Sequence, residues 1–129
     1  MLKGLLADDP LAEHLFSRSG LKPASFDIFL IQKTARKLKL FERLRLKDGG
    51  AVSKGAYYRS LRQGITQVRR CFYTLLLLSY LDLLDLDAIS RALTLVHEAG
   101  RGPKARQDKL QDIIATLDAL VHQLAEGKT

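Results

Sequence analysis

The sequence lacks most of the residues from which metal and redox sites are built. Its 129 residues include one cysteine, one methionine, three histidines and no tryptophan. A single cysteine excludes an intramolecular disulfide and any zinc or iron–sulfur site made of several cysteines. His14, His97 and His122 have no further His, Cys or carboxylate at i+3 or i+4 ligand spacing beyond what chance provides. We therefore expect no metal site and no other cofactor.

Nucleotide-binding and catalytic motifs are missing as well. Two glycine-rich fragments occur, at residues 49–50 and 100–102. Neither follows a strand pattern or precedes the Lys-Ser/Thr pair of a phosphate-binding loop. Cys71 stands beside Phe72 in an apolar stretch, so we interpret it as a small buried hydrophobic residue and not as a nucleophile. These features predict a protein that is not an enzyme.

Long apolar runs and a secretion signal are also lacking. The most apolar window, residues 71–81, is too short to span a bilayer, and Asp82 follows it directly. The first residues contain no apolar segment of signal-peptide length followed by a small-residue cleavage site. We therefore expect a cytoplasmic protein that does not bind membranes. The absence of asparagine and the scarcity of Met and Cys lean towards a thermophile.

Leucine dominates the residues that are present, with 26 positions, whereas the chain has three prolines and nine glycines. Apolar residues recur at helical spacing throughout, and no strand pattern competes with them. The sequence predicts an all-α fold, a compact helical bundle with at least about 65% helix and no sheet. We expect a helical domain with basic central helices over residues 1–100 and a C-terminal amphipathic helix over residues 104–129.

Two helices are predicted in the first third of the chain. Pro10 behind Asp9 indicates a short helix that ends near residue 20. The next helix is predicted to begin with Ser25 as N-cap and Asp27 in its first turn. Its apolar residues change face near Lys39, so that either one long helix lies between two layers or two helices meet there.

The central segment, residues 53–84, is predicted to be a long helix capped by Ser53. Its first half carries a single apolar stripe, whereas from Tyr73 onward it is apolar nearly all round. We therefore expect the second half to be the deepest part of the fold. The residues predicted to be most buried are Phe72, Leu75, Leu76 and Leu83.

Beyond this helix, Asp85 is predicted to cap another one that runs to residue 100, followed by a linker at residues 101–103. The last helix carries a short heptad seam, which either packs back on the bundle or joins two chains. Of these alternatives we favour a homodimer, since two-fold dimers are the commonest soluble oligomers. The predicted seam consists of Leu110, Ile113, Leu117, Leu120 and Leu124.

Charge is distributed unevenly along the chain, whose formal net charge is +7. Residues 28–81 hold twelve cations and two acids, and residues 54–81 contain no acid at all. Such a segment is typical of a protein whose partner is a polyanion or an acidic protein. A solvated basic surface without a partner is the simpler interpretation.

The cations of the central helix share one face. At about 100° per residue, Arg59, Arg62 and Arg69 fall within an arc of roughly 100°, together with Thr66 and Arg70, opposite the apolar stripe. Arginine and glutamine contact base edges in the DNA major groove, and arginine and threonine bind phosphate. The predicted nucleic-acid-binding residues are Lys54, Arg59, Arg62, Gln63, Thr66, Arg69 and Arg70.

The segment V-S-K-G-A-Y-Y-R-S-L-R-Q, residues 52–63, resembles the start of the recognition helix in helix-turn-helix DNA-binding proteins. In those proteins a Val/Ser pair closes the turn, and a small residue lets the helices cross. The resemblance implies that residues 40–46 form the preceding helix. The connection, residues 47–52, is longer than the usual turn of three or four residues.

The leading functional hypothesis is a non-enzymatic DNA-binding protein, a transcriptional regulator or a nucleoid-associated protein, that contacts duplex DNA with this basic face. The alternative is a helical interaction subunit of a larger nucleoprotein complex, in which the same cations contact RNA, phosphate or acidic protein without reading a sequence. A third possibility is a structural bundle that has no nucleic-acid contact.

Overall fold

The computed structural model describes residues 1–101 and 107–126. Seven helices cover 79% of these described residues, and none of the described residues is in a strand. The prediction of an all-α fold is therefore confirmed. The chain divides into two compact units, Met1–Phe72 and Tyr73–Thr129. The predicted linker at residues 101–103 lies outside the described residues except for Arg101, which ends a helix.

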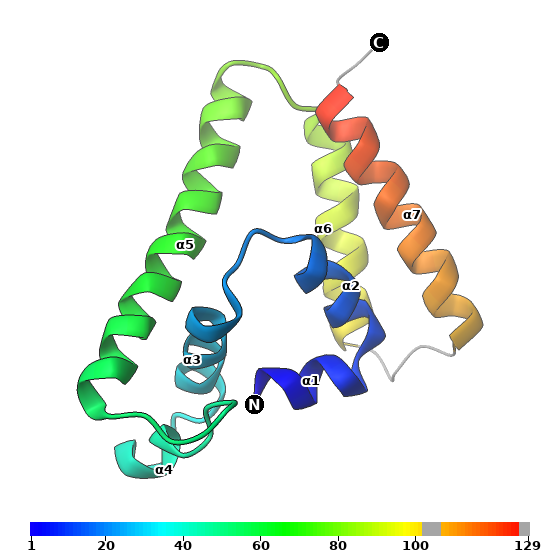
Figure 1. The fold of residues 1–129 in the computed structure, drawn as a ribbon. Coiled ribbons are helices and arrows are strands. Elements are labelled where there is room, and N and C mark those ends of the chain that lie inside the picture. Colours follow the sequence, from blue (N-terminus) through cyan, green and yellow to red (C-terminus); the bar gives the residue numbers. More distant parts are fainter. Residues whose placement is uncertain (102–106, 127–129) are drawn as a thin grey trace. The chain divides into compact units, whose positions relative to one another are not determined.

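The first unit begins with three helices, α1 (Leu2–Asp8), α2 (Pro10–Arg18) and α3 (Pro23–Thr34), which follow one another closely (Figure 1). Asp9 caps α2, since its Oδ1 accepts a hydrogen bond from the Ala12 N–H at 3.0 Å. Pro10 stands at the first helical position, where its missing N–H is not needed. The start of α2 agrees with the sequence-based prediction. Helix α1 was not predicted from the sequence.

The remaining helices of this unit are α4 (Leu40–Leu44) and the first part of α5 (Lys54–Tyr80). The interruption at residues 35–39 confirms the interpretation in which two helices meet near Lys39. The predicted cap of α5 is confirmed, because the Ala56 N–H donates to Ser53 Oγ at 3.2 Å.

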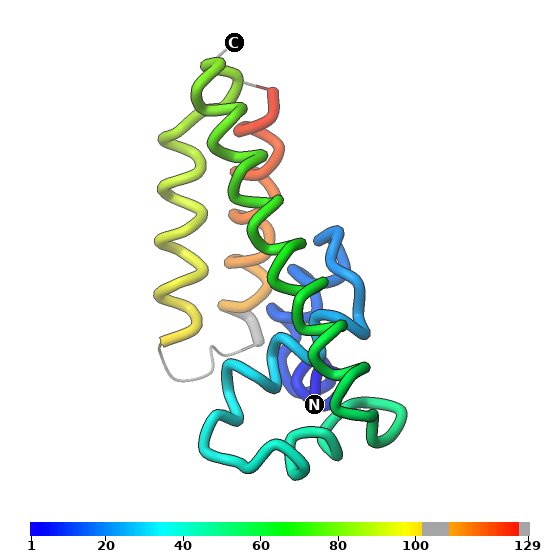
Figure 2. Tube along the Cα trace, turned by 90° about the vertical axis from the view of Figure 1, so that its left-hand side faces the viewer, coloured from blue at the N-terminus to red at the C-terminus, as the bar shows by residue number. Residues whose placement is uncertain are grey.

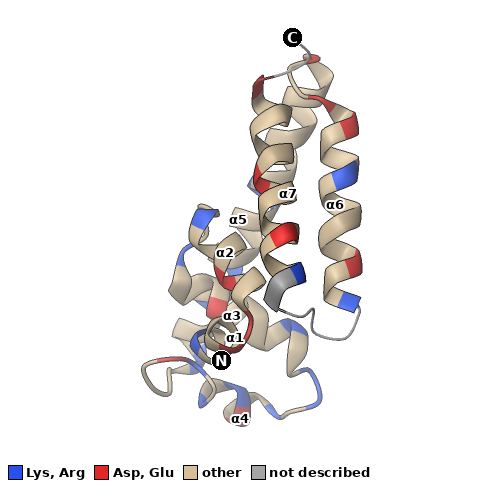
Figure 3. Ribbon diagram, turned by 90° about the vertical axis from the view of Figure 1, so that its right-hand side faces the viewer, with Lys and Arg blue, Asp and Glu red and all other residues tan. Residues whose placement is uncertain are grey.

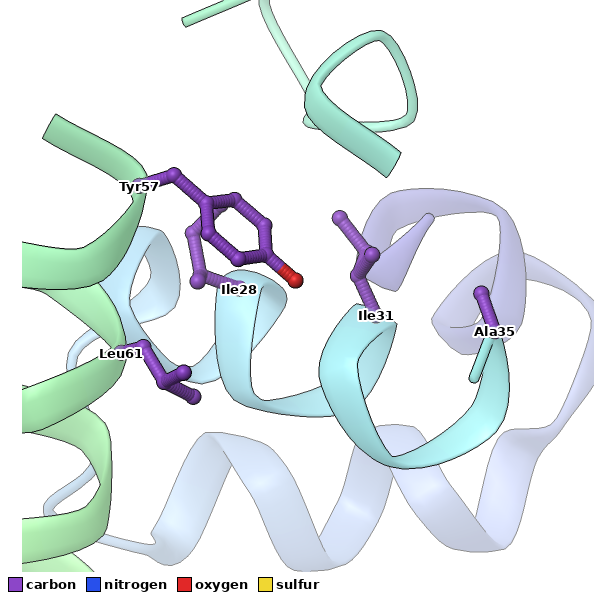
Figure 4. Close-up of a cluster of buried hydrophobic side chains, with 5 residues drawn as sticks. All are labelled: Ile28, Ile31, Ala35, Tyr57 and Leu61. Atoms are coloured by element: carbon purple, nitrogen blue, oxygen red, sulfur yellow. The ribbon is translucent and has the colours of Figure 1, made fainter. Parts of the chain in front are cut away.

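The core of the first unit lies between α3 and the start of α5. Tyr57 is completely buried among the other side chains of this core (Figure 4). Its hydroxyl donates to Gln32 Oε1 at 2.8 Å. The hydrogen bond satisfies the one polar group of an otherwise apolar cluster. Burial raises the pKa of Tyr57, against the opposing effect of the nearby Arg43 cation. The core cluster consists of Ile28, Ile31, Ala35, Tyr57 and Leu61.

The predicted capping of α3 is wrong. The helix begins at Pro23, after Lys22, so Ser25 and Asp27 lie within it and are both buried. Asp27 instead holds other segments: Oδ1 accepts from the Leu2 N–H at 2.9 Å and Oδ2 from the Asp48 N–H at 2.8 Å. A carboxylate in this position satisfies two backbone donors that the local sequence leaves without partners.

Helices α3 and α5 cross closely at Gly64. A Cβ atom built there would lie 2.9 Å from the Ser25 carbonyl oxygen and 3.2 Å from Phe29 Cβ. Gly64 faces about 170° away from the centre of the basic arc on the same helix. The contact therefore turns the apolar stripe of α5 towards α3 and leaves the arc in solvent.

The second unit comprises the end of α5, α6 (Leu86–Arg101) and α7 (Gln107–Glu126). Asp85 caps α6 as predicted, because its Oδ1 accepts hydrogen bonds from the Asp87 and Ala88 N–H groups at 3.0 and 3.2 Å. The other oxygen of Asp85 accepts from Gln123 Nε2 at 2.9 Å, which ties α7 to this cap. Helices α6 and α7 run side by side in opposite directions (Figure 2).

The prediction of a deep core after Cys71 is wrong. Phe72 and Leu76 expose 64% and 59% of their surface, and Leu75 and Leu83 are exposed as well. Cys71 is also exposed, contrary to its interpretation as a buried residue. A helix that is apolar all round is buried only when other elements surround it. In the second unit α6 and α7 bury their own shared face instead.

None of the described helices has both the length and the apolar character that a membrane span requires.

Candidate nucleic-acid interface

The basic arc lies on the exposed side of α5 in the first unit. Arg59, Arg62, Thr66, Arg69 and Arg70 are all exposed, whereas Tyr57 and Leu61 of the same helix are buried. The apolar stripe holds α5 against α3, so the side chains about half a turn away extend into solvent. The structure therefore presents the arc as a surface, in the orientation that the periodicity indicates.

Three of the guanidinium groups of this surface, those of Arg59, Arg62 and Arg69, make no ion pair with the described residues. Residues 54–81 contain no Asp or Glu. In the second unit acids and cations alternate along α6 (Figure 3), and Arg91 pairs with Asp87 at 3.6 Å one turn away. An unopposed group of cations produces the positive field that attracts a polyanion.

Part of the arc lines a shallow hollow of about 340 Å³ on the first unit. One wall comes from α5 and the other from the chain just before α3, at Lys22. The lining side chains are all polar or cationic, which suits a phosphate-bearing ligand better than an apolar one. The hollow is lined by Lys22, Arg59, Arg62, Gln63, Thr66, Gln67 and Arg70.

Two glutamines attach this wall to α3. The Ser25 hydroxyl donates to Gln63 Oε1 at 3.2 Å, and the Lys22 N–H lies 3.4 Å from Gln67 Oε1. Both amide oxygens thus accept hydrogen bonds within the protein, which leaves the side-chain NH₂ of Gln63 for a ligand. The role predicted for Gln63, bidentate contact with a base, requires this oxygen as well, so it requires the bond to Ser25 to open.

The structure brings together only some of the predicted site residues. Arg59, Arg62, Gln63, Thr66 and Arg70 share the hollow, whereas Lys54 and Arg69 are exposed outside it. Lys22 was missed by the sequence analysis. It lies 37 residues before Arg59 in the chain, and the periodicity of one helix carries no information about its neighbour.

The helix-turn-helix unit implied by the sequence is not confirmed. Helix α4 contains five residues and ends at Leu44, and the next helix begins at Lys54. The intervening segment, residues 45–53, is more than twice as long as the turn of such a unit. The basic face of α5 therefore has to be considered without the docking geometry of that motif.

The C-terminal seam packs within the chain. Leu117 and Leu120 of α7 are buried, with 3% and 9% of their surface exposed, and α7 packs on α6 in the second unit. The other three predicted seam residues, Leu110, Ile113 and Leu124, are half-buried. This is the first of the two arrangements expected from the heptad spacing. A homodimer through this seam remains a prediction.

The described residues contain no group of three or more His, Cys, Asp or Glu placed to hold a metal ion. Comparison with protein-family models, curated proteins and solved structures finds no match for this chain. The function of the basic surface must therefore be argued from its own chemistry.

Proposed function

We propose that this protein binds duplex DNA through the basic face of α5, as a non-enzymatic regulator of transcription or a nucleoid-associated protein. The observation that carries the proposal is the exposed set of arginines along one side of a helix segment that contains no Asp or Glu, part of which lines a polar hollow. The runner-up, an interaction subunit that binds RNA or acidic protein, is an outcome of the experiment below.

The chemistry of the face suits a sugar–phosphate backbone. Arginine presents its N–H donors as a planar fork that matches two phosphate oxygens, and the hydroxyl of Thr66 adds a further donor. Lys22, across the hollow from α5, supplies a cation from a second segment. Contacts from two directions favour a bound strand over a single point of attachment.

The dimensions of the helix favour a duplex. The major groove of B-DNA admits one α-helix, and α5 offers its cations over about three turns, from Arg59 to Arg70. The first unit contributes a formal charge of +9, counted over the six acids and fifteen cations of residues 1–72. Association with DNA is thus favoured over a long range before any base is contacted.

The test is fluorescence anisotropy of the full chain with labelled duplex DNA, single-stranded DNA and RNA over a series of salt concentrations. Each phosphate contact adds about 0.9 to the log–log salt slope for a duplex, so four contacts give a slope of roughly −4. We expect the triple variant Lys22→Ala/Arg59→Ala/Arg62→Ala to bind more weakly and to flatten the slope by roughly 2 to 3.

A control variant separates local contacts from net charge. The variant Arg91→Ala/Arg101→Ala/Lys109→Ala removes three exposed cations from the second unit and leaves the sequence of the first unit unaltered. It should keep the wild-type slope to within about one unit. Equal losses in both triple variants would show a general charge effect, and absence of binding at low salt would overturn the proposal. Preference for RNA or for an acidic protein would favour the interaction subunit.

A further inference from the structure

The hollow on the first unit is lined by hydrogen-bond donors. Its side chains come from α5 and from Lys22, the N-cap residue of α3, and none of them is a carboxylate or an aromatic ring. Lys22, Arg59 and Arg62 make no ion pair with the described residues. A lysine ammonium and an arginine guanidinium donate hydrogen bonds and cannot accept them. The cationic part of the lining therefore offers partners only to an acceptor, and best to an anion.

The two glutamines of the hollow add neutral donors to these cations. Their amide oxygens accept hydrogen bonds within the unit, Gln67 from the Lys22 N–H at 3.4 Å and Gln63 from the Ser25 hydroxyl at 3.2 Å. Their NH₂ groups donate to none of the described residues, so these donors remain for a ligand. The combination of cations with neutral N–H donors is the chemistry that binds phosphate oxygens.

A hollow of similar size in the second unit has a different lining. It measures about 350 Å³, against about 340 Å³ for the hollow on the first unit. Its lining includes the carboxylate of Glu98 and the apolar side chains of Leu95 and Leu120. An anion entering there would meet a like charge and apolar surface, both of which are unfavourable. The lining of cations and amides is therefore a particular property of the hollow on the first unit.

The volume of the hollow indicates the size of the anion. About 340 Å³ corresponds to the space of roughly eleven water molecules. A single phosphate ion would leave much of this volume to water, whereas two or three linked phosphates would fill it. Arg59 and Arg62 are three residues apart, about 4.5 Å along the axis of α5, so their guanidinium groups can bind neighbouring phosphates of one anion. Lys22 meets the same anion from the other wall.

We propose that the hollow is a binding site for a compact polyphosphate anion, either inorganic pyrophosphate or the diphosphate part of a nucleotide. The site needs no glycine-rich loop, because side chains from two segments supply the donors. The lining has no aromatic ring on which a base could stack, so the phosphates provide the binding free energy. Because Arg59 and Arg62 also belong to the basic arc, an anion bound between them and Lys22 would compete with DNA. This regulatory consequence rests on the proposed function, whereas the site itself does not.

Isothermal titration calorimetry of the full chain with sodium pyrophosphate tests the site, at constant ionic strength and without divalent cations or nucleic acid. We expect one anion to bind per chain. Sulfate should bind at least about tenfold more weakly, because it offers a single tetrahedral centre and less charge. ADP should bind within about tenfold of pyrophosphate, since its nucleoside finds nothing to stack on.

Two double variants of equal charge separate the hollow from the rest of the basic arc. Lys22→Ala/Arg59→Ala removes one cation from each wall and should weaken pyrophosphate binding by at least about 30-fold. Lys54→Ala/Arg69→Ala removes two exposed cations of α5 outside the hollow and should change it by less than about threefold. Gln67→Glu keeps the acceptor for the Lys22 N–H but adds a negative charge, and should weaken binding by at least about tenfold. Circular dichroism checks that each variant is folded.

Absence of pyrophosphate binding, or equal losses in the two double variants, overturns the site. Sulfate as tight as pyrophosphate would reject a polyphosphate ligand, and ADP more than about tenfold tighter would reject recognition of the phosphates alone. The anisotropy measurement with duplex DNA keeps the two proposals apart. Binding of DNA but not of pyrophosphate overturns this site and leaves the proposed function in place, whereas binding of pyrophosphate but not of DNA does the reverse.

Discussion

The two units of this protein use apolar residues and charges in opposite ways. The first buries Tyr57 completely and leaves its arginines in solvent, and its formal charge is +9. The second, with a formal charge of −2, pairs Arg91 with Asp87 on α6 and exposes Tyr80 and its neighbours. The comparison shows that a similar number of apolar residues can form a buried core in one unit and lie on the surface in the other, because burial depends on which helices pack together.

The sharpest way to test this comparison is to remove a tyrosine from each unit. Tyr57→Ala should lower the free energy of unfolding of the first unit by about 3–5 kcal/mol, because the fully buried ring leaves a cavity and Gln32 loses its donor. Tyr80→Ala should change the free energy of unfolding of the second unit by less than about 0.5 kcal/mol, because Tyr80 is 84% exposed. Urea unfolding followed by circular dichroism measures both.

Equal losses in the two variants would contradict the contrast between a buried and an exposed aromatic residue. An unaltered Tyr57→Ala protein would remove the α3–α5 core as the centre of the first unit.

The next effect in size concerns Asp27, which joins segments of the first unit that are distant in sequence. Asp27→Ala leaves the Leu2 and Asp48 N–H groups without their acceptor, at a cost of about 2–4 kcal/mol. Asp27→Asn keeps one acceptor oxygen and should lose about half as much. Thermal unfolding ranks the variants. The same loss for both would mean that the charge, and not the pair of hydrogen bonds, stabilises the unit.

A smaller effect is expected at the helix crossing that turns the basic arc outward. Gly64→Ala should destabilise the first unit by about 1–3 kcal/mol, because the added methyl meets the Ser25 carbonyl oxygen of α3. Gly55→Ala is the matched control on the same helix, where nothing lies within 4 Å. It should be neutral or stabilising by up to about 1 kcal/mol.

Denaturant unfolding of these two alanine variants provides the measurement. If Gly64→Ala were as stable as Gly55→Ala, the close approach of α3 and α5 would be disproved. The orientation of the arc would then need another explanation.

The smallest effect is a pH dependence confined to the first unit. Partial burial raises the pKa of Asp48, but the Met1 ammonium and the Lys3 N–H, which donates at 2.7 Å, outweigh it and lower the pKa below its ordinary value. The stabilisation is therefore complete above the ordinary Asp pKa and is lost as the pH falls through the lowered value. The stability of Asp48→Asn should therefore fall less steeply than that of the wild type as the pH is lowered through this range. The difference in the free energy of unfolding should be less than about 1 kcal/mol.

A pH titration of the thermal midpoint, between about pH 6 and pH 2, follows this loss. An identical slope in wild type and Asp48→Asn would show that the contact does not contribute.

Local rules accounted for much of the fold. Asp9, Ser53 and Asp85 cap helices where the sequence indicates, because a cap depends on a side chain and the N–H groups two or three residues away. The same holds for the basic arc, since positions on one helix are related by a fixed angle. These features need no knowledge of distant residues.

Burial was predicted poorly where it depends on other elements. The apolar residues after Cys71 were expected in the core and are exposed, while the polar Asp27 is buried. Apolarity gives the free energy that burial would release, but whether a face is covered depends on which helix reaches it. Lys22 joins the hollow for the same reason, through a contact between segments that no periodicity relates.

The sequence by itself thus determined that the chain is helical, where α2, α5 and α6 begin, and which face of α5 is cationic. Each of these follows from interactions within a few turns. Only the tertiary structure decided that Gly64 and not Gly55 marks the crossing with α3, that Asp27 binds two distant backbone groups, and that α7 packs on α6. Those outcomes depend on contacts between residues far apart in the chain, whose free energies become available only once the helices are packed together.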